Sequence, residues 1–144
     1  MSVKPVLARL LRLRELEEEQ SRLELEAAVA AQGSVERERN AVAQRQASER
    51  RAFVAGVEGG DYRVCTGAIV EMEQARSERG RIEVRLAGVE NEVRRQREEF
   101  IARRTSRKQV STLVDAAREE SEVEVARRVQ QMLDDWYGRR GPKR

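Results

Sequence analysis

Residues 82–136 read IEVRLAGVENEVRRQREEFIARRTSRKQVSTLVDAAREESEVEVARRVQQMLDDW, and this stretch decides the fold. Apolar residues recur in it at alternating steps of three and four, a spacing typical of the seam between two packed helices. The seam positions are Ile82, Leu86, Val89, Val93, Gln96, Phe100, Arg103, Arg107, Val110, Val114 and Ala117. No glycine or proline interrupts Val89 to Tyr137, so the sequence predicts one long helix here.

The spacing of this seam changes after Val114. Steps of four then lead through Ala117, Ser121, Val125 and Val129, and the alternation resumes at Met132 and Trp136. Such an insertion is a stutter, which turns the apolar row of a coiled coil in a new direction. We therefore expect the last turns of the helix to face a different direction or a different partner.

The composition fits a helical rod better than a compact globule. Of the 144 residues, 38% are charged and only 3% are aromatic, which leaves few large side chains for a globular core. The net charge of +3 does not demand a nucleic-acid binder. Basic residues are in excess between Arg94 and Lys108; we interpret them as a solvated helix face, with a patch for an acidic protein or for phosphates as the alternative.

Several kinds of chemistry lose their usual residues. The chain has one cysteine, Cys65, and no histidine, so an internal disulfide is excluded and zinc sites and histidine-based catalysis lack their common groups. Acidic neighbours such as Asp134 and Asp135 diverge on a helix and do not converge on a metal. No apolar run is long enough to cross a bilayer, and the start lacks the order of a signal peptide. We predict a cytoplasmic protein that is no enzyme and has no cofactor or metal.

The first third of the chain predicts the partner helix, from about residue 5 to residue 55. Pro5 suits the first turn of a helix, where its missing N–H costs nothing. A three-four spacing marks the expected seam of this helix, formed by Leu13, Leu16, Gln20, Leu23, Ala27 and Ala30, with Leu7, Leu10 and Leu11 widening the apolar face.

A cluster of helix breakers between the two helices predicts the turn. It contains Gly56, Gly59, Gly60 and Asp61, and we place the turn at about 56–66 and the second helix at about 67–137. Thr66 is the expected N-cap, with Asp61 as an earlier candidate. The fold class is all-α, with two long helices forming an antiparallel coiled-coil hairpin in one domain over 1–144, and a basic tail at 138–144.

The two helices differ in length, which predicts a C-terminal helical overhang. Folding about Gly60 brings the N-terminus near Ala117 and leaves Arg118 to Tyr137 without an intramolecular partner. Its apolar residues are expected to meet another protein; a frayed end and a self-associating end are the alternatives.

Residues 10–20 read LLRLRELEEEQ, a run of leucine, arginine and glutamate at the start of the first expected helix. This run resembles the opening of the first helix in the FliJ family of flagellar export proteins. Phe100 with Arg103 and Arg104, and then QQMLDD at residues 130–135, are similar to its C-terminal pattern. The turn region departs from the family, because it is rich in glycine and poor in aromatic residues.

The resemblance implies a non-enzymatic stalk in the flagellar type III export apparatus. Such a stalk inserts into the export ATPase ring, promotes its assembly and activity, and links it to the membrane-embedded export gate and to export chaperones. It also implies a position at the flagellar base, at the inner face of the cell membrane. From the overhang we predict the ATPase contact at Val125, Arg128, Val129, Met132, Leu133 and Trp136. Near the turn, the predicted gate contact is Phe53, Tyr62, Ile69 and Met72.

Three other interpretations remain open at this point. The equivalent stalk of a virulence injectisome would have the same hairpin. A parallel homodimeric scaffold would be a dimer in solution, whereas the hairpin is expected to be a monomer. A basic nucleic-acid-binding coil would use Arg94 to Lys108, and its binding would weaken steeply with salt.

Overall fold

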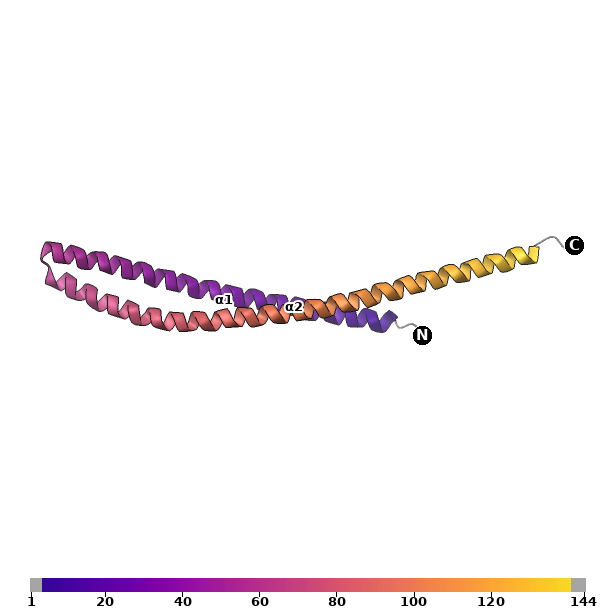
Figure 1. Ribbon diagram of the computed structural model, residues 1–144, viewed down its shortest axis with the longest axis horizontal. Helices are drawn as coiled ribbons and strands as arrows, with labels where there is room; N and C mark the ends of the chain where they lie inside the picture. The colour runs from indigo at the N-terminus through magenta and orange to yellow at the C-terminus, as the bar shows by residue number, and fades with distance from the viewer. Residues whose placement is uncertain (1–3, 141–144) are drawn as a thin grey trace. The chain divides into compact units, whose positions relative to one another are not determined.

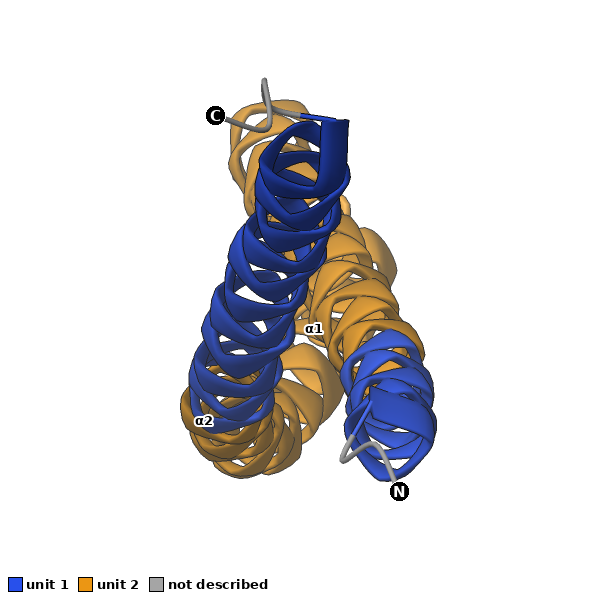
Figure 2. Cartoon of the chain, turned by 90° about the vertical axis from the view of Figure 1, so that its right-hand side faces the viewer, with its two compact units in different colours: residues 1–20, 101–144 blue, residues 21–100 orange. Residues whose placement is uncertain are grey.

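The computed structural model describes residues 4–140, which form two helices, α1 (Lys4–Gly59) and α2 (Tyr62–Arg140) (Figure 1). The chain divides into two compact units, unit 1 with residues 1–20 and 101–144 and unit 2 with residues 21–100 (Figure 2). Within each unit, a stretch of α1 packs against a stretch of α2 that runs the opposite way. The predicted all-α fold of two long helices in an antiparallel hairpin is confirmed.

The end of α1 in unit 2 is closed by a glycine in the left-handed region. Gly60 has a φ of 67°, and its N–H donates to the carbonyl oxygen of Val57 at 3.3 Å. The N–H of Asp61 donates to the carbonyl oxygen of Gly56 at 2.9 Å. These two bonds satisfy carbonyls that the last turn of a helix otherwise leaves unpaired.

The start of α2 is capped by the next residue, Asp61. Its Oδ1 accepts hydrogen bonds from the backbone N–H groups of Arg63 at 3.1 Å and Val64 at 3.3 Å. Thr66, the first choice for this cap, instead donates its hydroxyl to the carbonyl oxygen of Tyr62 at 2.8 Å. The predicted Thr66 cap and the long turn at 56–66 are therefore wrong, and the alternative cap Asp61 is confirmed, because this aspartate lets α2 begin at Tyr62.

The core of unit 2 consists of small and branched side chains. Ala75 is completely buried, and it clusters with Val35, Val42, Ile82 and Leu86, each at most 5% exposed. Val89 packs against this cluster. The seam predicted for α2 is thus confirmed in unit 2.

The seam predicted for α1 is wrong in both units. In unit 1, Leu13 and Leu16 are exposed, and in unit 2 Leu23 is exposed. The other members of that row, Gln20, Ala27 and Ala30, are also exposed. The buried positions of α1 in unit 2 are Ser21, Ala28, Val35, Val42 and Gly56. The predicted leucine row ends near Ala30. The buried row instead repeats every seven residues as far as the turn, so it can pack along the whole of α2 in unit 2 although its side chains are smaller.

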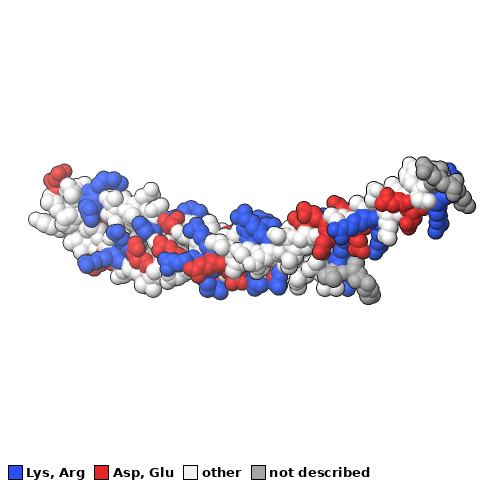
Figure 3. Space-filling model, turned by 45° about the vertical axis from the view of Figure 1, so that its right-hand side comes forward, with Lys and Arg blue, Asp and Glu red and all other residues white. Residues whose placement is uncertain are grey.

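Ion pairs between the helices of unit 2 flank the buried row. An Arg45 guanidinium nitrogen lies 2.5 Å from a carboxylate oxygen of Glu78, and Arg85 lies 2.7 Å from Glu38. The hydrogen bond and the charge of Glu78 raise the pKa of Arg45. Such flanking pairs contribute little stability when exposed but favour one register and orientation. Figure 3 shows both signs of charge interleaved over the face in view.

One seam position of unit 2 holds a polar side chain, Gln96, which is 8% exposed. Its Nε2 donates to Oε1 of Glu92 at 2.9 Å, and Arg95 donates to both oxygens of that carboxylate at 2.7 and 3.1 Å. The hydrogen bonds from Arg95 and then from Gln96 lower the pKa of Glu92 to about 2. A charged surface group and a seam residue are coupled through this contact.

The close packing at the turn makes Gly56→Ala destabilising. An added Cβ would lie 2.9 Å from Sγ of Cys65 and 3.2 Å from the carbonyl oxygen of Asp61, so the turn would have to shift. We expect the free energy of unfolding to fall by about 1–3 kcal/mol, as for overpacked sites in general. Thermal unfolding followed by circular dichroism measures it.

Gly59→Ala is the matched control, because a Cβ there meets nothing within 4 Å. In a helix, alanine is favoured over glycine by about 1 kcal/mol, so this variant should be no less stable than the original chain. Equal destabilisation by both substitutions would contradict the turn packing described above.

Gln96→Leu should raise the pKa of Glu92 above about 2 and leave it below its ordinary 4.5, because one donor is lost and Arg95 remains. The pKa of Glu92 is lower in the folded chain, so its contribution to stability is complete above about pH 4.5 and is lost as the pH falls toward 2. In Gln96→Leu the folded and unfolded pKa values of Glu92 lie closer together, so the pH range over which this contribution is lost becomes narrower. Carbon-13 NMR titration of the Glu92 carboxyl measures it, with the exposed Gln74→Leu as the control; an unchanged pKa would contradict the coupling.

Candidate functional site

The candidate site is the end of α2 in unit 1, where α2 continues past the start of α1 (Figure 1). Val110 and Val114 are buried, and Ala117 and Ser121 are half-buried. Every residue from Glu122 to Arg140 is exposed. From here on, the overhang means residues 122–140.

The overhang begins about one turn later than its predicted start at Arg118. Lys4 of α1 lines a surface depression of about 350 Å³ together with Arg118, Ser121 and Val125 of α2. Ser121 is the last half-buried residue of α2, whereas Arg118 is exposed.

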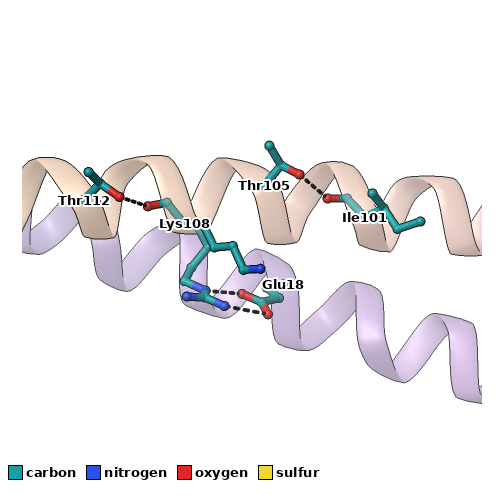
Figure 4. Close-up of polar contacts among 6 residues, drawn as sticks. Glu18, Ile101, Thr105, Lys108 and Thr112 are labelled. Carbon is teal, nitrogen blue, oxygen red and sulfur yellow. Dashed lines mark hydrogen bonds and ion pairs between the residues drawn. The ribbon is translucent and has the colours of Figure 1, made fainter.

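Charged side chains hold α1 on α2 just before the overhang. Nε of Arg107 donates to Oε2 of Glu18 at 2.6 Å, and a second bond to Oε1 is 3.5 Å long. Figure 4 shows Glu18 reaching from α1 toward α2, while Thr105 and Thr112 bond to carbonyls of their own helix. The bond to Glu18 raises the pKa of Arg107, and Arg103 also pairs with Glu17 at 3.3 Å. At Arg103 and Arg107 these bonds take the place of apolar packing, and the buried Val110 and Val114 resume that packing further along α2.

The overhang presents an apolar row on one face of the helix. The row consists of Val125, Val129, Met132 and Trp136, which are 56%, 50%, 71% and 47% exposed. Their spacing of four, three and four places them on a single face. We call these four residues the overhang row.

The other two predicted contact residues border this row. Leu133 is 45% exposed, and Arg128 pairs with Glu124 of its own helix at 2.7 Å. Val123 and Tyr137 are also exposed but were not among the predicted contacts. Val123 lies on the opposite face of the helix, a position that its spacing from Val125 already indicates.

Two aromatic rings and a guanidinium group contact one another at the C-terminal end of the overhang. The rings of Trp136 and Tyr137 meet edge to face with centroids 5.0 Å apart. The guanidinium carbon of Arg140 lies 4.4 Å from the centre of the Trp136 ring, a cation–π contact. Trp136 is therefore held in place by its own helix before any partner binds.

The turn end of unit 2 divides the predicted gate residues into two pairs. Tyr62 and Ile69 are exposed, at 83% and 48%, whereas Phe53 and Met72 are half-buried beside the seam. The Tyr62 and Ile69 side chains can meet a partner without unfolding. Four further exposed apolar residues near the turn were missed, namely Val54, Val57, Val64 and Val70.

Among residues 4–140, no group of three or more Cys, Asp or Glu side chains is arranged to hold a metal ion. In the same range, no helix combines the length and apolar character needed to cross a membrane.

These features define an antiparallel coiled-coil protein with exposed apolar surfaces on its helices. The profile of the family described as "Flagellar FliJ protein" matches residues 3–143, and the chain belongs to this family. The family is a non-enzymatic component of the export apparatus, so the chain is a protein associated with flagellar type III export. Comparison with curated proteins gave no match, and neither did comparison with solved structures.

Proposed function

We propose that this chain is the coiled-coil stalk of the flagellar type III export ATPase. The overhang inserts into the ring of ATPase subunits and promotes ring assembly and ATP hydrolysis. The observation that supports this role is the overhang row, which lies on the part of α2 that extends beyond the N-terminal end of α1.

The overhang has the properties of a helix that docks into a groove. Its 19 residues extend about 28 Å at 1.5 Å per residue, and one face offers four large apolar side chains. Apolar anchors at this spacing are how amphipathic helices bind grooves in their partners. Bonds within the helix, such as Glu124 to Arg128, order it before binding and so lower the entropy cost of association.

The turn end is the proposed contact with the export gate, and it brings the protein to the inner face of the cell membrane. Tyr62 and Ile69 are the residues we assign to it, because they are exposed. Phe53 and Met72 support this surface from the seam. Export chaperones complete the proposed partners, with no residue assigned to them.

The overhang row should be required for stimulation of the ATPase. Val129→Asp combined with Met132→Asp places two charges in the contact, and we expect binding to the ring to weaken about tenfold or more, as for central interface residues in general. ATP hydrolysis by the purified export ATPase, measured against stalk concentration, tests it. Deleting residues 122–144 should abolish stimulation and leave the helical hairpin folded.

Val123→Asp is the matched control, since it introduces the same charge on the opposite face of the overhang. It should leave stimulation and helix content unchanged. Full stimulation by the Val129→Asp, Met132→Asp variant or by the deletion would reject the proposed contact.

Substitutions at exposed residues near the turn should affect gate binding, whereas a substitution at a half-buried residue should affect stability. Tyr62→Ala and Ile69→Ala together should weaken binding to the cytoplasmic part of the export gate, with little effect on thermal unfolding, because both side chains are exposed. Met72→Ala should instead lower the unfolding temperature, because its side chain is half-buried at the seam. Calorimetric titration and thermal unfolding distinguish the two effects; unchanged gate binding by the double variant would move the gate contact elsewhere.

A further inference from the structure

We infer that the overhang is also a self-association surface, on which two copies of this chain pair antiparallel. The charges of the overhang reverse sign about a centre between Gln130 and Gln131, close to its midpoint. In order along the helix they are Glu122 and Glu124, Arg127 and Arg128, Asp134 and Asp135, Arg139 and Arg140. Turned end for end, this order brings each acidic pair to the level of a basic pair along the helix, and Arg128 and Asp135 are the members that border the overhang row.

The overhang row is symmetric about the same midpoint. Val129 and Met132 are equally far from it, and so are Val125 and Trp136. In an antiparallel pair with this centre, Val129 packs against Met132 of the second copy, and Val125 packs against Trp136 of the second copy. A two-fold pair needs a surface that is complementary to itself, and this row meets that requirement.

Arg128 and Asp135 give the pair its direction. They lie seven residues apart along the same border of the overhang row. In the antiparallel pair, Arg128 of each copy faces Asp135 of the other copy, so the ion pair forms twice. A parallel pair in register would instead place Arg128 beside Arg128 and Asp135 beside Asp135, which repel.

The overhang is prepared for this contact by its own helix. Arg128 is held by Glu124 at 2.7 Å yet keeps 72% of its side chain exposed, and Gln130 donates to Asp134 at 3.0 Å. Arg140 covers one side of the Trp136 ring. The helix is therefore ordered before pairing, and less conformational entropy is lost on association.

The balance of charge favours a second copy over a ligand of one sign. The overhang has four acidic and four basic residues, Glu122, Glu124, Asp134 and Asp135 against Arg127, Arg128, Arg139 and Arg140. Residues 122–140 have no net charge and Lys143 and Arg144 add only two positive charges beyond them, so charge gives this end little general attraction for nucleic acid or for an acidic membrane surface. Alternating charges beside an apolar row suit a partner helix whose charges occur in the reverse order. The overhang of a second copy, turned end for end, has that order.

Pairing covers the same face that we propose for the ATPase ring. A paired stalk and a ring-bound stalk are then exclusive states, and binding of the ring competes with the second copy by mass action. The inference does not depend on the ring contact, because it rests on the order of charges and apolar residues within the overhang.

The test is the mass of the full chain by sedimentation equilibrium over a dilution series. We expect a monomer–dimer equilibrium in the original chain. Arg128→Asp places Asp against Asp135 twice, and Asp135→Arg places Arg against Arg128 twice. Each variant alone should raise the dimer dissociation constant about tenfold or more, since both ion pairs become repulsive.

Mixing the two variants should restore the dimer, because each reversed residue then meets its opposite on the other chain. The single chain that carries both Arg128→Asp and Asp135→Arg should dimerise as the original does. Arg127→Asp is the matched control, since Arg127 lies on the far side of the helix from the overhang row, and it should leave the dissociation constant unchanged. Trp136, the single tryptophan, reports the same equilibrium through its emission, which should shift to the red on dilution.

Three results would overturn the inference. These are a monomer at every concentration, a dimer that persists when residues 122–144 are deleted, and a mixture of Arg128→Asp with Asp135→Arg that stays monomeric. Circular dichroism of each variant establishes that its helices are intact, so a lost dimer reports the contact and not unfolding.

Discussion

The packing of α1 on α2 depends on one row of buried side chains that repeats every seven residues. In unit 2 the row uses small and branched residues, with Ala75 fully buried among Val35, Val42 and Ile82. Small side chains allow close approach of the helices but bury little apolar area per turn. In unit 1 the ion pair of Glu18 with Arg107 occupies the seam. The large apolar residues of the chain are therefore mostly outside the seam, where they are available to partners.

The sequence could predict α2 because only one apolar row runs along it. α1 has two candidate rows, and the leucines of the wrong one are the larger residues. The choice between them depends on contacts with residues more than thirty positions away, such as those between Glu38 and Arg85, which local spacing does not contain. The turn was predicted too long for a related reason: glycines count as helix breakers in a sequence, although Gly56 and Gly59 lie within α1 in the structure.

The overhang could be predicted because it follows from the unequal lengths of the two helices. The turn end was harder, because residues near a turn alternate between seam and surface within a few positions. Phe53 and Met72 look as suitable for a contact as Tyr62 and Ile69, yet only the second pair is exposed. The stalk role, the gate contact and the pairing of overhangs remain proposals that use these surfaces.

The turn in unit 2 has a mechanical consequence. Asp61 donates its N–H to the last turn of α1, while its side chain and carbonyl oxygen accept from the first turn of α2. One residue thus belongs to the hydrogen bonding of both helices, and no flexible linker separates them. A force applied to either helix near the turn is transmitted to the other through these hydrogen bonds. This end of the hairpin therefore behaves as a rigid connection and not as a flexible hinge.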